Sequence, residues 1–278
     1  MSLPRLTLCR WHAAAVTLAL ALVGVVSETG SETVTGKAQR RVAVIAHRGA
    51  HEQAPENTIP AIQAAIDLGV DYVEIDVQTT KDGALVLMHN HTVERTTNGT
   101  GAIRDLAFAE IRALDAGAWF SPQFAGTRVP TADEALGIMR GKAAAYLDTK
   151  DIAPDSVVAL LRRNEMLASV VYDGPANLAK MLRVESAIRT MPEYPGSPEA
   201  LRALADSIRL DVVAISSLRN LSPEAVAACH AVNAQVFLDI MAQDNPEGWG
   251  RAIECGVDGI QTDRPAALLR CLRGRELH

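Results

Sequence analysis

The chain has 278 residues, of which 48% are hydrophobic and only 4% aromatic, and its formal net charge is −6. This length and composition leave room for one large soluble domain or two small ones. The small share of aromatics argues against a belt of Trp and Tyr at a membrane interface, and because no basic block is present, nucleic acid is not expected as a partner.

The N-terminus has the pattern of a secretory signal peptide. Arg5 and Arg10 precede the apolar run AAAVTLALALVGVV, which is shorter than the roughly 20 residues that a membrane-spanning helix needs. We therefore predict a signal peptide over residues 1–27, a polar linker over residues 28–41, and a secreted or periplasmic mature protein without a stable membrane span. The match to a cleavage site is only fair, so an uncleaved N-terminal anchor is the alternative.

From residue 42 onward, short β-rich apolar segments alternate with helical patterns. The apolar segments cover residues 42–46, 71–77, 84–89, 143–149, 169–173, 186–191, 211–216, 235–241 and 258–263. Helical patterns such as NTIPAIQAAIDLG and SPEALRALADSIR lie between most of them. This alternation is typical of a parallel sheet with helical crossovers.

One connection is too short for a helical crossover. Only QTTKDG separates segment 71–77 from segment 84–89, and its Asp-Gly pair is a strong signal for a two-residue hairpin turn. The later segment must therefore return antiparallel on the second strand, which leaves eight parallel strands. We predict an α/β fold, a (β/α)8 TIM barrel over residues 42–273, with a small insertion at about residues 91–128. An open doubly wound sheet is the alternative, although it would usually show a glycine-rich phosphate loop that is absent here.

The predicted hairpin brings ionisable residues together. A two-residue turn at Asp82-Gly83 places Asp76 opposite His89 in the antiparallel ladder. Glu74 lies two residues before Asp76 and so points to the same face of the strand. Burying two carboxylates among Tyr, Val and Ile costs several kcal/mol unless a positive charge compensates them. A cation is therefore expected beside them.

Further charged residues occupy the same end of the predicted barrel. His47 and Arg48 directly follow the first strand, and Asp148 and Lys150 share a face near the end of AAAYLDTK. Active sites of (β/α)8 barrels lie at the C-terminal ends of the strands. We therefore expect these residues to converge on one site.

Three carboxylates belong to this predicted site, those of Glu74, Asp76 and Asp148. Oxygen ligands with room for water suit a hard divalent cation, Ca²⁺ or Mg²⁺. Zinc is disfavoured, because no HxH, HExxH or cysteine set accompanies the carboxylates. A single carboxylate at a strand end is usually a helix cap or an ion-pair partner, so the prediction depends on all three converging.

The ordered motifs of the chain resemble those of the glycerophosphodiester phosphodiesterase family. The matching motifs are His47-Arg48-Gly49, Pro55-Glu56-Asn57-Thr58, Glu74-x-Asp76, TKDG, His89, RTTNGTG, Ala118-Trp119-Phe120, Val129-Pro130-Thr131 and DGIQTDRP. They span about residues 42–270. The resemblance implies a (β/α)8 barrel with a small insertion, in agreement with the pattern of segments.

The resemblance also implies roles for the charged residues. The implied ligands of a divalent cation, Ca²⁺ or Mg²⁺, are Glu74, Asp76 and Asp148. The implied acid/base pair is His47 and His89, and the implied phosphate-binding residues are Arg48 and Lys150. We expect Glu56 to orient Arg48 or a ligand. The implied reaction is the hydrolysis of a small glycerophosphodiester to glycerol 3-phosphate and an alcohol.

The implied roles make chemical sense. The cation and the two basic residues neutralise charge that builds on the phosphate oxygens. One histidine takes a proton from the nucleophile, and the other gives one to the leaving alkoxide. The sequence does not fix the direction, and we assign His47 as the base and His89 as the acid only as a working hypothesis.

Three positions depart from the family pattern. Asn90 stands where the family has Asp, Asp148 stands where it has Glu, and QVFLDIM replaces a strand that contains Trp. Two other functions therefore stay open. One is a phospholipase D-like enzyme acting on lysophospholipid or sphingolipid, with apolar insertion residues Leu106, Phe108, Trp119 and Phe120. The other is a catalytically impaired barrel kept as a binding protein, which Asn90 favours.

Other ionisable residues near the site receive structural interpretations. His51 and His91 are expected to be solvent-exposed loop residues. Asp239 lies near a strand end and is a candidate to line the mouth of the barrel. Asp263, just before Arg264-Pro265, is expected to cap a helix.

Overall fold

Nine strands form one sheet in the part of the chain that the computed structural model describes, residues 40–278. Eight of them lie in the order β6-β5-β4-β2-β1-β9-β8-β7, each parallel to its neighbours. A parallel bridge between Glu193 and Ala214 links β6 to β7, so the barrel is nearly closed. The predicted TIM-barrel fold is thus confirmed. The predicted signal peptide and most of the linker fall outside the described residues.

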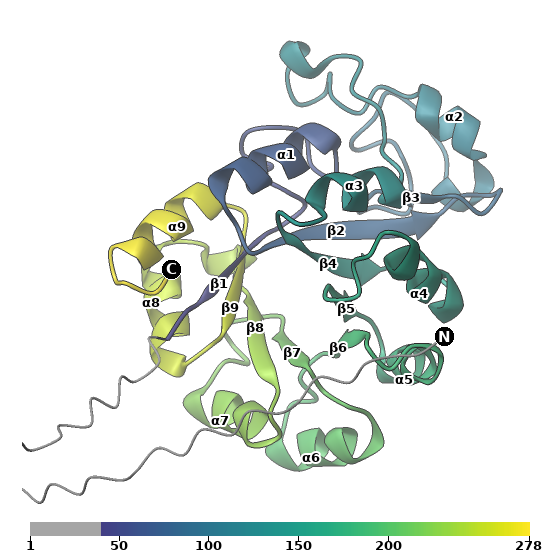
Figure 1. Cartoon of the computed structure of the whole chain (residues 1–278). Coiled ribbons are helices and arrows are strands. Elements are labelled where there is room, and N and C mark those ends of the chain that lie inside the picture. The colour runs from purple at the N-terminus through teal and green to yellow at the C-terminus, as the bar shows by residue number, and fades with distance from the viewer. Residues whose placement is uncertain (1–39) are drawn as a thin grey trace, which may run out of the picture. The chain divides into compact units, whose positions relative to one another are not determined.

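The strands of the sheet are short, and helices follow most of them. The strands are β1 (Ala43–Ala46), β2 (Tyr72–Thr79), β3 (Leu85–Leu87), β4 (Ala144–Thr149), β5 (Val170–Tyr172), β6 (Arg189–Met191), β7 (Val212–Ile215), β8 (Gln235–Asp239) and β9 (Gly259–Thr262). The α-helices are α1 (Ile59–Leu68), α2 (Phe108–Ala113), α3 (Ala132–Met139), α4 (Pro154–Arg163), α5 (Pro175–Val184), α6 (Pro198–Ser207), α7 (Pro223–Ala231), α8 (Pro246–Cys255) and α9 (Pro265–Arg273). Figure 1 shows the helices around the outside of the barrel.

Successive side chains of β2 point alternately to the main core outside the barrel and to the barrel interior. Its outward residues pack in the main core, and these are Val73, Ile75 and Val77. Tyr72 points inward, where its ring meets that of Phe237 at 5.2 Å between centroids. Glu74 and Asp76 follow Tyr72 at two-residue spacing, so they face the interior above this apolar layer. Both are almost fully buried, at 2% and 1% exposure.

The hairpin between β2 and β3 differs from the prediction by one residue. Its turn covers three residues, 81–83, and Gly83 adopts the left-handed region with φ 85°. The backbone N–H of Met88 donates to the carbonyl of Asp76, and the ladder places Met88, not His89, opposite Asp76. The predicted register was wrong because a turn that ends in a left-handed glycine also fits a three-residue loop.

His89 enters the barrel mouth through a bend that follows β3. The buried side-chain amide of Gln78 donates to the carbonyl oxygens of Met88 and Asn90, at 2.7 Å each. These bonds hold the backbone on both sides of His89. The bend, and not the ladder, therefore turns this histidine toward the carboxylates of β2.

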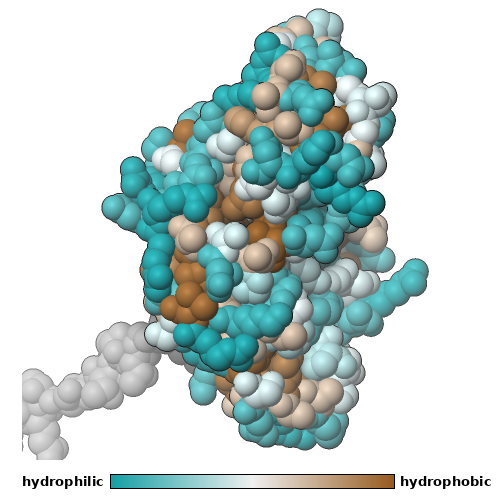
Figure 2. Space-filling model, turned by 90° about the vertical axis from the view of Figure 1, so that its right-hand side faces the viewer, coloured by the Kyte–Doolittle hydropathy of each residue, from teal (hydrophilic) through white to brown (hydrophobic). Residues whose placement is uncertain are grey.

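The segment after β3 packs as a small layer of its own beside the barrel (Figure 1). The buried apolar residues of this layer are Val86 of β3 and, after the strand, Met88, Val93, Ile103, Ile111, Ala116 and Val129. On the face in Figure 2, hydrophobic residues form separate patches among hydrophilic ones. Within residues 40–278, no helix combines the length and apolar character needed to cross a membrane.

Gly49, in the turn that follows β1, is expected to tolerate no side chain. It has φ 85°, and a Cβ there would lie 2.7 Å from the backbone carbon of Ala61. Gly83 has the same φ but open space around it. We predict that Gly83→Ala lowers the free energy of unfolding by about 1–2 kcal/mol, and that Gly49→Ala costs about 1–3 kcal/mol more, because α1 must shift. Urea unfolding compares the pair, and equal losses would contradict the steric argument.

Candidate active site

A cavity of about 250 Å³ opens at the C-terminal ends of the barrel strands. The predicted site residues that line it are His47, Arg48, Glu74, Asp76, His89 and Asp148. Lys150 instead lines a neighbouring cavity of about 520 Å³, and Glu56 lies behind Arg48. The structure therefore brings together residues of β2 and β4 and of the segments that follow β1 and β3, as the sequence predicts.

The three carboxylates form a compact cluster on neighbouring strands. Asp76 of β2 pairs in register with Asp148 of β4, and one oxygen from each of these and from Glu74 lies within 4.8 Å of the others. Burial and the charges of Asp76 and Asp148 raise the pKa of Glu74 well above its usual value. Burial also raises the pKa of Asp148. An all-oxygen cluster whose members repel one another fits a hard divalent cation.

Neighbouring polar groups hold Asp76 in place. The side-chain amide of Asn57 donates to Asp76 Oδ2 at 2.8 Å, and the Asp76 backbone N–H donates back to the side-chain Oδ1 of Asn57 at 3.2 Å. The ammonium group of Lys150 contacts Asp148 and lies 3.3 Å from Asp76. Lys150 thus bridges two of the carboxylates in the structure, at the edge of the cavity.

Arg48 is fixed from both its backbone and its side chain. The backbone N–H of Arg48 donates to the Glu74 carboxylate at 2.7 Å, and the Arg48 backbone has a left-handed φ of 54°. Its guanidinium donates to Glu56 at 3.1 Å, and Arg95 donates to the same carboxylate at 2.6 and 2.8 Å. Burial opposes ionisation of Glu56, but the two arginines outweigh it and lower its pKa. Glu56 therefore stays charged and positions Arg48 toward the cavity.

Each of the two site histidines has a different partner on Nδ1. His47 Nδ1 lies 2.6 Å from the carboxylate of Asp263, and His89 Nδ1 lies 2.9 Å from the side-chain oxygen of Asn90. The same Asn90 oxygen accepts from Arg95 at 3.1 Å, which identifies it as the carbonyl oxygen. The proton of neutral His89 is therefore on Nδ1, and in both rings Nε2 is left for the cavity. Asn90 keeps the orienting contact without adding negative charge.

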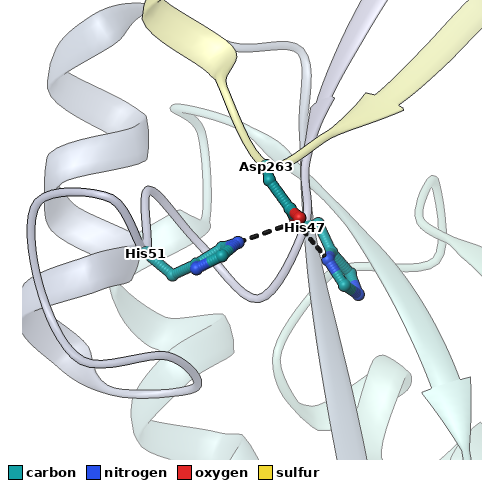
Figure 3. Close-up of side chains that lie close together, drawn as sticks. All are labelled: His47, His51 and Asp263. Atoms are coloured by element: carbon teal, nitrogen blue, oxygen red, sulfur yellow. Dashed lines mark hydrogen bonds and ion pairs between the residues drawn. The ribbon is translucent and has the colours of Figure 1, made fainter. Parts of the chain in front are cut away.

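Two expectations from the sequence are wrong at the rim. Asp263 caps no helix, because α9 has Arg264 at its N-cap and no side-chain cap bond. His51 is not a free loop residue, because its Nε2 lies 2.7 Å from Asp263 (Figure 3). Burial would raise the pKa of Asp263, but the hydrogen bonds from His47 and His51 more than reverse this and lower it. The missed signal is barrel closure, which pairs β1 with β9.

The cavity is also lined by aromatic residues that were not among the predicted site residues. Tyr146 and Tyr172 line it, with ring centroids 6.2 Å apart, together with Phe237. Asp239, at the end of β8, lines it as the sequence predicts, and burial raises the pKa of its carboxyl. The cavity therefore combines basic, acidic and aromatic side chains.

Comparison with known proteins identifies relatives over most of the chain. The model of the glycerophosphoryl diester phosphodiesterase family matches residues 47–267. A glycerophosphodiester phosphodiesterase of Caldanaerobacter subterraneus subsp. tengcongensis is 34% identical over 245 residues, which cover 83% of this chain and 97% of that protein.

Solved structures give the same result. A glycerophosphodiester phosphodiesterase from Agrobacterium tumefaciens is 30% identical, with a TM-score of 0.73 over 81% of this chain and 99% of that one. An Oleispira antarctica phosphodiesterase in complex with sn-glycerol-3-phosphate shares the fold, with 23% identity and a TM-score of 0.74 over 83% of this chain and 96% of that one. From the family model, the relatives and the shared barrel, we conclude that the chain belongs to the glycerophosphoryl diester phosphodiesterase family.

Proposed function

We propose that the protein hydrolyses glycerophosphodiesters to glycerol 3-phosphate and an alcohol, with Ca²⁺ or Mg²⁺ bound by Glu74, Asp76 and Asp148. The observation that carries this proposal is one cavity in which the buried carboxylate cluster lies with Arg48 and two histidines. The signal pattern at the N-terminus supports a secreted or periplasmic location.

Each group of residues has a task in the proposed reaction. A bound divalent cation supplies positive charge that polarises the phosphate oxygens. Arg48 and Lys150, which both contact Asp76, add positive charge, which the anionic diester needs before a nucleophile can approach. His47 and His89 keep Nε2 toward the cavity, so one ring can accept a proton and the other can donate one. We keep His47 as the base and His89 as the acid.

The product supports the assignment of substrate class. The Oleispira antarctica relative binds sn-glycerol-3-phosphate, and several relatives are glycerophosphodiester phosphodiesterases. A cavity of about 250 Å³ suits a small polar diester better than a lipid with a long acyl chain.

Product analysis tests this function directly. The purified protein, supplied with Ca²⁺ or Mg²⁺, is offered glycerophosphocholine, glycerophosphoethanolamine and lysophosphatidylcholine. We expect glycerol 3-phosphate from the first two and at least about tenfold slower release of choline from the third, since the site cavity of about 250 Å³ leaves little room for its acyl chain. Faster turnover of lysophosphatidylcholine would favour the phospholipase D-like alternative.

The exposure of the apolar insertion residues bears on the phospholipase D-like alternative. Trp119 of the insertion is 43% exposed and stacks edge-on against Phe120, whereas Leu106 and Phe108 are half-buried. If a lipid surface docks there, Trp119→Ala should slow turnover of lysophosphatidylcholine alone. The impaired-barrel alternative loses its support from Asn90, because this amide still orients His89.

A further inference from the structure

A second group of metal-binding side chains lies at the rim of the cavity. His47 Nδ1 and His51 Nε2 lie 2.6 and 2.7 Å from the same oxygen, Oδ1, of Asp263. The three donor atoms all lie within 4.8 Å of one another. Figure 3 shows both imidazole rings directed at this one carboxylate, which comes from the far end of the sequence.

We propose that His47, His51 and Asp263 form a second cation site, which binds a borderline transition-metal ion such as Zn²⁺ and thereby inhibits the enzyme. The donor set decides the class of ion. Two imidazole nitrogens with one carboxylate are typical zinc ligands, whereas the all-oxygen cluster on β2 and β4 suits Ca²⁺ or Mg²⁺. The inhibition rests on the proposed function, but the binding does not.

The rim cluster has the access and flexibility that such an ion needs. The side chains of His47, His51 and Asp263 are 14%, 27% and 34% exposed, so an ion can reach them from solvent. Zinc holds nitrogen and oxygen ligands at about 2.0–2.2 Å, which puts neighbouring donor atoms roughly 3.3 Å apart. The present contacts are shorter because protons bridge them, and small side-chain rotations open them to that spacing. Water can fill the fourth position.

The charge state of the cluster also suits a cation. Asp263 accepts both hydrogen bonds on one oxygen and leaves the other oxygen outside these contacts. Its carboxylate oxygen lies within hydrogen-bond distance of two imidazole nitrogens, an environment that favours the ionised form at neutral pH. No cationic lysine or arginine makes an ion pair with it among the described residues. A metal ion would therefore replace two shared protons and displace no salt bridge.

A metal ion on Nδ1 changes what the other nitrogen of His47 can do. In the metal-free ring, the proton is on Nδ1, and Nε2 is a free acceptor on the cavity side. A metal ion requires Nδ1 without a proton, so the single proton of the neutral ring moves to Nε2. If the ring was imidazolium, its second proton passes to solvent. Nε2–H cannot accept a proton, and the neutral metal-bound ring is a poor acid, so either catalytic role is blocked.

The experiment titrates the Ca²⁺- or Mg²⁺-loaded full chain with Zn²⁺ and compares it with two histidine variants. His51→Ala removes one proposed ligand, and His91→Ala is the control, because His91 contacts Gln78 on another side of the mouth. We expect Zn²⁺ to inhibit the wild type and His91→Ala alike. We expect His51→Ala to need about 10- to 100-fold more Zn²⁺ for the same inhibition, because losing even an outer-shell partner of a metal site lowers metal affinity by about this factor. The inhibition of each variant is expressed relative to its own turnover without Zn²⁺.

Isothermal titration calorimetry supplies a readout that does not depend on activity. It should detect one Zn²⁺ equivalent in the loaded wild type and none of that affinity in His51→Ala. His51→Gln, which keeps a donor for Asp263 but is a poor zinc ligand, should behave like His51→Ala and guards against a folding defect. Equal zinc binding in wild type and both variants would overturn the proposal. Inhibition that excess Ca²⁺ relieves would also overturn it, because the ion would then occupy the carboxylate cluster.

Discussion

Replacing Glu74 by Gln is expected to abolish turnover and, at the same time, to stabilise the metal-free protein. Glu74 is buried within 4.8 Å of two other carboxylates. Without a cation, its charge is costly to the fold, and Gln removes the charge while keeping an acceptor for the Arg48 backbone N–H. In the proposed cation-bound enzyme the same charge would be a ligand, and its loss should lower kcat at least about 10³-fold.

The pH dependence of stability follows from the direction of the pKa shift. Burial and like charges raise the pKa of Glu74 in the folded protein, so the folded state holds this proton more tightly than the unfolded chain. The metal-free wild type should therefore lose stability as the pH rises from the ordinary carboxyl pKa through the raised one.

Thermal unfolding in EDTA measures this difference. Glu74→Gln should not lose stability over this pH range. At neutral pH its melting temperature should exceed that of the wild type by roughly 2–4 °C for each 1 kcal/mol gained in the free energy of unfolding. The control is Glu254→Gln, at an exposed position on α8, which should change neither activity nor melting temperature. A less stable Glu74→Gln protein would show that the three carboxylates do not repel one another in the fold.

Replacing either cavity histidine by Asn is expected to lower kcat by about 10²- to 10⁴-fold. The proposed proton-transfer groups are His47 Nε2 and His89 Nε2, and each ring is oriented through its Nδ1. Asn retains polarity but cannot exchange a proton near neutral pH. Because the two rings act in one proton-transfer sequence, the double variant should be hardly slower than the slower single variant.

Steady-state kinetics and product inhibition separate catalysis from binding in these variants. Inhibition by glycerol 3-phosphate should persist with a similar inhibition constant, since Arg48 and the carboxylate cluster are untouched. His89→Asn with full activity would remove its acid/base role, and the same result for His47 would also remove the reason why zinc at the rim inhibits.

Local periodicity in the sequence was enough to predict the fold. Strand-sized apolar segments and one connection too short for a helix led to eight parallel strands, which the structure confirms. Alternation also placed Glu74 and Asp76 on the inner face of β2. Both features depend only on residues close together in the chain, where side-chain direction has a fixed period.

Contacts that depend on exact register or on barrel closure could not be predicted. The sequence placed His89 near the carboxylates for a wrong reason, because the three-residue turn shifts the ladder and the Gln78 amide then bends the chain back. His51 and Asp263 are 212 residues apart and meet only because β1 pairs with β9. The local sequence around Asp263 indicates only the start of a helix. The two histidine partners of Asp263 become apparent only in the closed barrel.

The central claim is that cleavage requires a divalent cation held by Glu74, Asp76 and Asp148. Initial rates of glycerophosphocholine hydrolysis by metal-stripped protein, titrated with Ca²⁺ or Mg²⁺, test it most directly. We predict no turnover above background in EDTA. Adding Ca²⁺, Mg²⁺ or both should restore the activity of the wild type saturably, and it should not restore the activity of Glu74→Gln. Turnover that survives in EDTA would contradict the claim.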